Sequence, residues 1–150
     1  MMEIYVDADA CPVKDEVFRV AKRYGFKVWL VSNTGIRIPK DIFVEMVVVK
    51  DHFDAADDWI AENIHENDIA VSADIPLASR CLKNGARVID PKGRVLTKET
   101  IGDALANREL SAYLRDMGNN TGGPAPYAKR DRSRFLQHLD GLIQAVLRGK

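Results

Sequence analysis

The sequence predicts an α/β fold with three layers, in which a mostly parallel, five-stranded sheet carries helices on both faces. Short apolar runs recur through the first 90 residues, and segments with helical spacing of apolar residues separate them. Chains that alternate in this way fold with right-handed crossovers, which place helices on both faces of a parallel sheet. We expect a single domain, with a core over about residues 1–95 and a helical C-terminal extension over about 97–150.

The first 50 residues contain three predicted strands and one helix. Glu3 to Val6 is a short apolar strand, and Pro12 suits the first position of the helix that follows. Gly25 is expected to end that helix, after which Lys27 to Val31 forms the second strand. Val44 to Val49 is a β-branched run that is typical of a buried strand.

Two further helix–strand units complete the predicted sheet. A helix is expected over about residues 55–65, and the strand Ile69 to Ser72 follows it. A second helix over about residues 75–84 ends at Gly85, and the short strand Arg87 to Ile89 comes next. This order gives parallel neighbours joined by helices.

The last 50 residues are predicted to be helical on either side of one loop. The loop covers residues 118–128, which are rich in Gly, Asn and Pro. A final amphipathic helix follows it. Its expected apolar face consists of Phe135, Leu139, Leu142, Ile143, Val146 and Leu147.

Composition excludes several classes of protein. The 22 basic and 22 acidic residues balance, so the chain lacks the overall basic charge of a nucleic-acid coat protein. Two cysteines, Cys11 and Cys81, are too few and too far apart for a disulfide framework or a thiolate zinc site. No segment approaches the roughly 20 apolar residues that span a bilayer. We expect a protein of the cytoplasm with no membrane partner.

Acidic residues recur where predicted strands end or helices begin. The ends of parallel strands open on one edge of a sheet, which is where open α/β folds bind ligands. Carboxylates that converge there repel each other by about 1 kcal/mol or more per pair, so a divalent metal ion between them is expected. The residues concerned are Asp7, Asp9, Asp54, Asp57, Asp58, Asp74 and Asp90.

Structural explanations compete with metal binding at each of these positions. Asp7 and Asp9 point the same way in extended geometry, and if Cys11 caps the next helix neither aspartate is needed as its cap. Asp57 and Asp58 begin a helix, where the helix dipole alone favours carboxylates. Both interpretations stay open for that pair.

The serine–aspartate pair after the fourth predicted strand has two compatible roles. Asp74 is the natural N-cap of the helix that begins near Ile75, and a capping carboxylate can also bind a metal. Ser72 supplies a hydroxyl that could hold a metal-bound water or a phosphate. Asp90 precedes Pro91 and ranks below the other aspartates as a candidate metal ligand, because it can simply begin a turn.

A basic segment follows the Gly/Pro loop and contains Tyr127, Lys129, Arg130, Arg132 and Arg134. An aromatic residue among cations is the composition that holds single-stranded nucleic acid or phosphate, whereas cations beside a helix are also often only solvated. Both interpretations stay open.

Cysteine and histidine give weaker signals. Cys11 could be a nucleophile at a helix N-terminus, although no histidine lies nearby in the sequence to act as its base. His52, His65 and His138 lack metal-ligand spacing.

Four segments together resemble the YaiI/YqxD family of bacterial proteins, and the resemblance covers nearly the whole chain. They are VDADACPVK, DAADDWI, SADIPLASRCLKNGA and TGGPAPYAKRDRSRF. That family is usually placed among the PIN-like nucleases. The resemblance therefore implies a parallel sheet with an acidic pocket for one or two Mg²⁺ or Mn²⁺ ions. It also implies a metal-dependent nuclease whose partner is nucleic acid, with RNA favoured over DNA.

By position, the first acid of a PIN-like domain falls on Asp7, with Asp9 close behind, and the helix-opening Ala-Asp-Asp falls on residues 56–58. The Thr/Ser-x-Asp-x-x-Leu-Ala motif begins at Ser72. Some related nucleases have a further acid where this chain has Pro76, so the number of metals stays open. The implied catalytic and metal-binding residues are Asp7, Asp9, Asp57, Asp58 and Asp74. Phosphates are expected to bind Ser72, Lys14, Lys129, Arg130 and Arg132.

Two alternatives remain. Asp7 and Asp9 could be the nucleophile and acid of a phosphatase like the haloacid dehalogenases, although that motif prefers Thr or Val where this chain has Cys11. The domain could also bind metal and RNA without catalysis.

Overall fold

The structure is a computed structural model that describes residues 2–8, 13–33, 44–49, 55–102 and 129–149. These residues form a six-stranded sheet in the order β3-β2-β1-β4-β5-β6. Five strands are parallel and β6 alone is antiparallel to its neighbour. The strands are β1 (Glu3–Asp7), β2 (Lys27–Ser32), β3 (Val44–Val48), β4 (Ile69–Val71), β5 (Arg87–Ile89) and β6 (Val95–Leu96).

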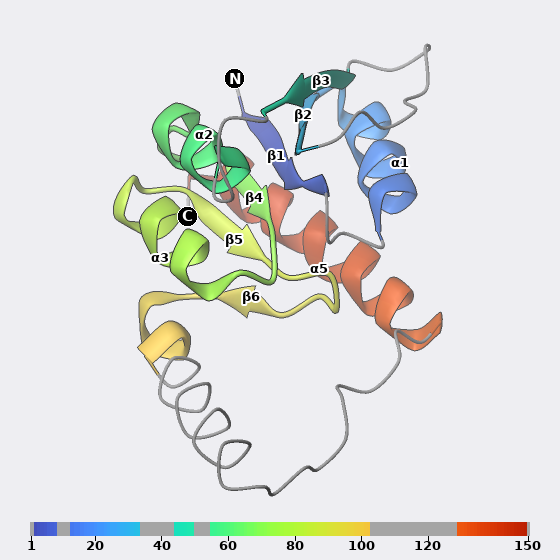
Figure 1. Cartoon of the computed structure of the whole chain (residues 1–150). Helices are drawn as coiled ribbons and strands as arrows, with labels where there is room; N and C mark the ends of the chain where they lie inside the picture. The colour runs from blue at the N-terminus through green and yellow to red at the C-terminus, as the bar shows by residue number, and fades with distance from the viewer. Residues whose placement is uncertain (1, 9–12, 34–43, 50–54, 103–128, 150) are drawn as a thin grey trace, which may run out of the picture.

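Helices cover both faces of the sheet, which confirms the predicted three-layer α/β fold (Figure 1). The labelled helices are α1 (Lys14–Tyr24), α2 (Ala55–Asn63), α3 (Ile75–Lys83) and α5 (Lys129–Leu147). A further short helix occupies residues 98–102. Residues of α1 and α5 pack on one face of the sheet, and residues of α2 and α3 pack on the other.

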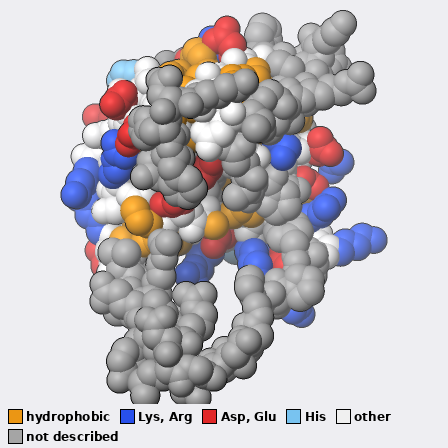
Figure 2. Space-filling view, in the orientation of Figure 1, with side chains coloured by type: hydrophobic (Ala, Val, Ile, Leu, Met, Phe, Trp, Pro, Cys, Tyr) orange, Lys and Arg blue, Asp and Glu red, His pale blue; other side chains and the backbone are white. Residues whose placement is uncertain are grey.

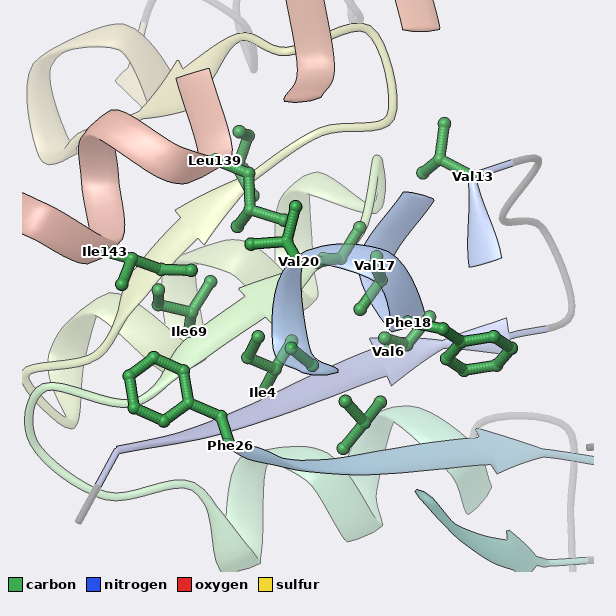
Figure 3. Close-up of a cluster of buried hydrophobic side chains, with 14 of the residues drawn as sticks. Ile4, Val6, Val13, Val17, Phe18, Val20, Phe26, Ile69, Leu139 and Ile143 are labelled. Carbon is green, nitrogen blue, oxygen red and sulfur yellow. The ribbon is translucent and has the colours of Figure 1, made fainter. Parts of the chain in front are cut away.

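The face under α1 and α5 contains the largest apolar cluster (Figure 3). Ile4 and Val6 of β1 point into it, and Val17 of α1 packs over them. Phe135 and Leu139 bring α5 into the same cluster, and neither is exposed to solvent. Burial of each such large apolar side chain stabilises the fold by about 1.5–3 kcal/mol. The C-terminal helix is therefore part of the core.

The opposite face contains an aromatic group beside α2. Tyr5 of β1, Trp29 of β2 and Trp59 of α2 have ring centroids 5.5–6.2 Å apart. The Glu3 carboxylate accepts hydrogen bonds from the Tyr5 hydroxyl at 3.2 Å and from Trp29 Nε1 at 3.0 Å. Burial of the Tyr5 hydroxyl, together with the nearby Glu3 and Asp68 charges, raises its pKa.

The beginning of α1 differs from the predicted one. The helix begins at Lys14, and its N-cap position is Val13, whose side chain makes no capping hydrogen bond. The prediction that Cys11 caps this helix was therefore wrong, because a proline that suits the first helical turn does not fix a helix boundary to within two residues. The end was predicted correctly, since Gly25 is left-handed and donates to Ala21.

Four other predictions need correction. The sheet has six strands and not five, because the two-residue strand β6 is too short to give a pattern in the sequence. The β-branched run of β3 forms an edge strand that is half exposed, because composition does not indicate where in a sheet a strand lies. Leu147 was placed on the apolar face of the last helix but is 59% exposed, since it occupies the final turn. The basic segment from Lys129 lies within α5 and does not precede it, which agrees with the high helix propensity of Lys and Arg.

Among the described helices, none is both long enough and apolar enough to cross a membrane.

The β5–β6 turn lies directly against α5 at Gly93. This residue has a φ of +89°, and a Cβ atom there would lie 2.9 Å from the backbone C and O of Arg134 and from the N of Phe135. Only glycine permits both this conformation and this approach. Gly93 therefore fixes the distance between the turn and the helix.

Gly93→Ala is expected to lower the free energy of unfolding by about 2 kcal/mol or more, because it adds backbone strain and a clash with α5. The matched control is Gly141→Ala, since a Cβ at Gly141 meets nothing within 4 Å. This control should raise stability by about 0.5–1 kcal/mol, as expected for a glycine replaced inside a helix. Urea denaturation measures both, and equal midpoints for the two variants would contradict the packing described.

Candidate functional site

The strand order places a ligand-binding edge between β1 and β4. The chain runs outward from β1 to β2 and β3, then crosses back to place β4 on the other side of β1. In open α/β sheets, ligands bind at the carboxyl ends of the strands where the order reverses in this way. β1 ends at Asp7, and Ser72 directly follows β4.

The register of the two strands brings Asp7 and Ser72 together. Val6 pairs with Val71, so the next residues along each strand lie side by side. The Ser72 hydroxyl donates to Asp7 Oδ2 at 3.2 Å. The same hydroxyl accepts the backbone N–H of Asp74 at 3.0 Å. Ser72 is only 3% exposed, and its hydroxyl therefore joins two chain segments that are 65 residues apart.

Asp74 caps α3, as the sequence predicted. Its Oδ1 accepts the N–H of Leu77 at 2.9 Å, and the carboxylate is partly exposed. Its Oδ2 has no hydrogen-bond partner within the part of the chain that the structure describes. The structure thus groups three of the predicted residues, Asp7, Ser72 and Asp74, which we call the switch-point cluster. Asp9 lies outside the described residues.

The carboxylates of α2 face α3. Asp58 accepts a hydrogen bond from Arg80 at 2.7 Å, and this bond raises the pKa of the Arg80 guanidinium. The Asp57 charge acts on Arg80 and on Cys81.

Cys81 has no nucleophilic role in this arrangement. Its side chain is fully buried, and burial raises the pKa of the thiol to about 12. A thiol with this pKa stays protonated and inert at neutral pH. Cys11, the cysteine that the sequence analysis considered as a nucleophile, lies outside the described residues.

The donor set of the switch-point cluster fits a hard divalent cation with few protein ligands. Within the described ranges, no group of three or more His, Cys, Asp or Glu side chains could hold a metal ion. The cluster instead offers two carboxylates and a hydroxyl. Mg²⁺ typically keeps several water molecules and binds one or two carboxylates together with substrate phosphates. Oxygen donors of this number and type are therefore compatible with Mg²⁺ or Mn²⁺.

Basic residues lie at the same edge of the sheet. Lys14 Nζ donates to the carbonyl of Ala8 at 3.4 Å, one residue beyond Asp7. Arg132 of α5 lies 3.7 Å from Glu16, in the first turn of α1. The beginning of α5 and the carboxyl end of β1 are therefore on the same side of the molecule (Figure 1). Lys129 and Arg130 are exposed there.

Asp90 has the structural role that its sequence context suggested. Its Oδ1 accepts the N–H groups of Lys92 at 3.0 Å and Arg94 at 2.8 Å, which closes the turn between β5 and β6. The same edge also contains polar residues that the sequence analysis did not single out: Ser32, Asn33, Lys92 and Arg94. Their position at the carboxyl end of a strand or in the turn that follows it was the signal that could have identified them.

The buried acid at the opposite edge is structural. Asp68 precedes β4 and accepts the N–H groups of Glu3 at 3.0 Å and His65 at 2.9 Å. Burial raises the pKa of its carboxyl group despite these bonds. His65 lies 3.8 Å from Asp68 and is itself exposed. At the amino edge, the Asp68 carboxylate thus holds β1 and the turn before β4 together.

The comparisons with known proteins identify the family. A family model described as the uncharacterised YaiI/YqxD family matches residues 5–145. The chain belongs to this family. It is 56% identical over 154 residues to a UPF0178 protein of Rhodospirillum centenum, with all of both chains covered. A UPF0178 protein of Paramagnetospirillum magneticum is 53% identical over 148 residues, which cover 99% of this chain and 98% of the relative.

A UPF0178 protein of Caulobacter vibrioides is 51% identical over 140 residues, which cover 93% of this chain and 92% of the relative. No solved structure matches the chain. The resemblance that the four sequence segments indicated is confirmed at the level of the family.

Ser72→Ala is expected to lower the free energy of unfolding by about 1 kcal/mol, because the Asp7 carboxylate and the Asp74 N–H each lose a partner at a nearly buried position. Ser79→Ala on α3 is the matched control. That hydroxyl makes no hydrogen bond within the described residues, so a change below about 0.5 kcal/mol is expected. Equal urea midpoints for the two variants would show that the Ser72 hydroxyl does not hold the cluster together.

Proposed function

We propose that this protein is a divalent-metal-dependent nuclease that hydrolyses phosphodiester bonds of RNA or DNA at the carboxyl edge between β1 and β4. The observation that carries the proposal is the hydrogen-bonded arrangement of Asp7, Ser72 and Asp74 at the reversal of strand order. Family membership is compatible with this activity, and the resemblance to PIN-like nucleases suggests the reaction.

The cation would be Mg²⁺ or Mn²⁺, held by Asp7 and Asp74. The Ser72 hydroxyl fixes Asp7 from one side, which reduces the freedom that a ligating carboxylate would lose on binding. Asp9, Asp57 and Asp58 are further candidate ligands. The ion pair between Asp58 and Arg80 is partly exposed to solvent and is worth at most about 1 kcal/mol, so Asp58 would lose little if it bound a metal ion instead.

A bound metal ion would lower the pKa of a water molecule and offset the negative charge that develops on the phosphate. The protein residues would position the reactants. Ser72 would orient Asp7, and the N-terminus of α3 beside Asp74 would favour negative charge at the edge. This arrangement requires neither a histidine base nor a protein nucleophile.

Basic side chains near this edge would bind the phosphates that flank the cleaved bond. Lys14 lies at the end of β1, and Arg132 lies against the first turn of α1. Lys129 and Arg130 begin α5 nearby. Arginine and lysine side chains both pair well with phosphate oxygens, so these four residues form a suitable binding surface.

The main alternatives predict different products. A phosphatase would use Asp7 as nucleophile and Asp9 as acid, and the position of Asp7 at the end of the central strand also suits that role. It would form an aspartyl phosphate, which beryllium fluoride mimics. A metal- and RNA-binding module would bind without turnover, which the small number of described acidic ligands also suits.

The test is cleavage of labelled single-stranded RNA, hairpin RNA, single-stranded DNA and flap DNA with Mn²⁺ or Mg²⁺. Asp7→Asn and Asp74→Asn should each lower the rate by at least about 100-fold, the upper range for loss of even an outer partner of a metal. Asp90→Asn is the matched control at the same edge. Its side-chain oxygen can still close the turn, so the rate should change only a few-fold.

Cleavage that persists in EDTA, or that survives in both folded variants, would contradict the proposal. Stable beryllium fluoride binding without cleavage of any polynucleotide would favour the phosphatase. Metal-dependent RNA binding without turnover would favour the binding module.

A further inference from the structure

A groove lies between the β5–β6 turn and α5. Its volume is about 560 Å³, which is within the range of sites that hold small organic ligands. The turn side provides Gly93, Arg94 and Val95, and the helix side provides Gln137, His138, Gly141 and Leu142.

The walls of this groove are held at a fixed separation. Gly93 packs against the α5 backbone, where only glycine fits. His138 Nδ1 lies 2.5 Å from the Gly93 carbonyl oxygen. A carbonyl oxygen only accepts, so Nδ1 carries the proton and the imidazole ring is held in one orientation. Gly141 leaves space on the helix side, because a Cβ there would meet nothing within 4 Å.

The lining matches the chemistry of a nucleotide. Val95 and Leu142 offer apolar surface for a base, and the fixed His138 ring can stack on one. The Gln137 amide can both donate to and accept from base edges. Arg94 is an exposed cation that forms no ion pair within the described residues, and it can bind a phosphate.

Further cations continue the groove along α5 towards its beginning. Arg130, Arg134 and His138 are successive exposed residues at a spacing of four, which corresponds to steps of about 6 Å along the helix. Arg130 and Arg134 form no ion pair within the described residues. Figure 2 shows Lys and Arg side chains on the side of the molecule where α5 begins. A chain of phosphates would follow this row.

We propose that the groove binds one nucleotide of a single-stranded polynucleotide, and that the exposed cations of α5 bind the adjoining phosphates. A base inside a duplex must first be unstacked and unpaired, so a single strand places a base in such a hollow at lower cost. This inference rests on the proposed function and specifies its substrate.

The backbone at the end of β5 connects the switch-point cluster to the turn that forms one wall of the groove. The Ser72 N–H donates to the Ile89 carbonyl at 3.1 Å, and the turn that carries Arg94 begins at the next residue. A strand that leaves the cluster can therefore pass over this turn into the groove.

The experiment measures binding of a fluorescein-labelled single-stranded RNA of about 12 nucleotides, a length within the range of single-strand sites, in EDTA to prevent cleavage. Gly141→Leu should fill the groove and weaken binding by about tenfold or more. Its control is Gly102→Leu, since Gly102 also has open space around it and lies outside the groove. Urea denaturation should show that Gly141→Leu is at least as stable as the wild type, because the substitution removes a glycine from a helix interior.

Charge is tested separately. Arg94→Gln should weaken binding and lower the salt dependence by about one counterion. Arg148→Gln removes the same charge at the far end of α5 and should leave affinity within a few-fold of the wild type. If Gly141→Leu fails to fold, the comparison of Arg94→Gln with Arg148→Gln tests the inference by itself.

Weaker binding by both groove variants but by neither control would support the inference. Equal binding by all four variants, tighter binding of the corresponding duplex by wild type, or no binding of single-stranded RNA or DNA would overturn it. Cleavage with unchanged affinity in the groove variants would reject the groove and retain the nuclease. Groove-dependent binding without any cleavage would retain the groove and reject the nuclease.

Discussion

The hydrogen bond from Ser72 to Asp7 depends on the register of β1 and β4, and the candidate site depends on that bond. Parallel pairing of Val6 with Val71 places the next residues of both strands side by side. The buried Ser72 hydroxyl then links the Asp7 carboxylate to the Asp74 backbone, and Asp74 in turn caps α3. A shift of one residue in this register would turn the side chains of a strand to the other face and separate the three groups.

The two edges of the sheet use acidic residues for different purposes. At the amino edge, Asp68 is buried and bonded to two backbone N–H groups, which closes the turn into β4. At the carboxyl edge, Asp7 and Asp74 are partly exposed and lie where the strand order reverses. A buried and bonded carboxylate stabilises local structure, whereas partly exposed carboxylates on either side of one hydroxyl group are suited to bind a cation. Position and bonding separate these roles, and residue type alone does not.

Much of this arrangement could be predicted because its signals are local. The alternation of apolar runs and helices indicated the layers, and Asp74 before Ile75 indicated a helix cap that the structure contains. The contact between Ser72 and Asp7 required the order and register of strands that are far apart in the sequence. The edge position of β3 and the two-residue strand β6 also depend on tertiary packing, and no local pattern marks either of them.

The groove beside α5 could not be predicted from the sequence for the same reason, because distant segments form it. The basic segment was recognised from its composition, but its inclusion in a helix and its closeness to the β5–β6 turn were not. Gly93 and His138 lie 45 residues apart in the sequence, and no local pattern indicates that the two segments meet. Only the close approach of turn and helix brings these side chains to one place.

The most direct test of the central claim is to locate bound Mn²⁺ by its paramagnetic broadening of backbone amide signals in NMR spectra of the intact protein. A metal site at the switch-point cluster predicts that the amides around Asp7, Ser72 and Asp74 broaden first. Asp7→Asn should abolish that effect without altering the remainder of the spectrum. Broadening centred instead on Asp68 or on Asp131 and Asp140 of α5, or unchanged in the Asp7→Asn variant, would contradict a metal site at this cluster.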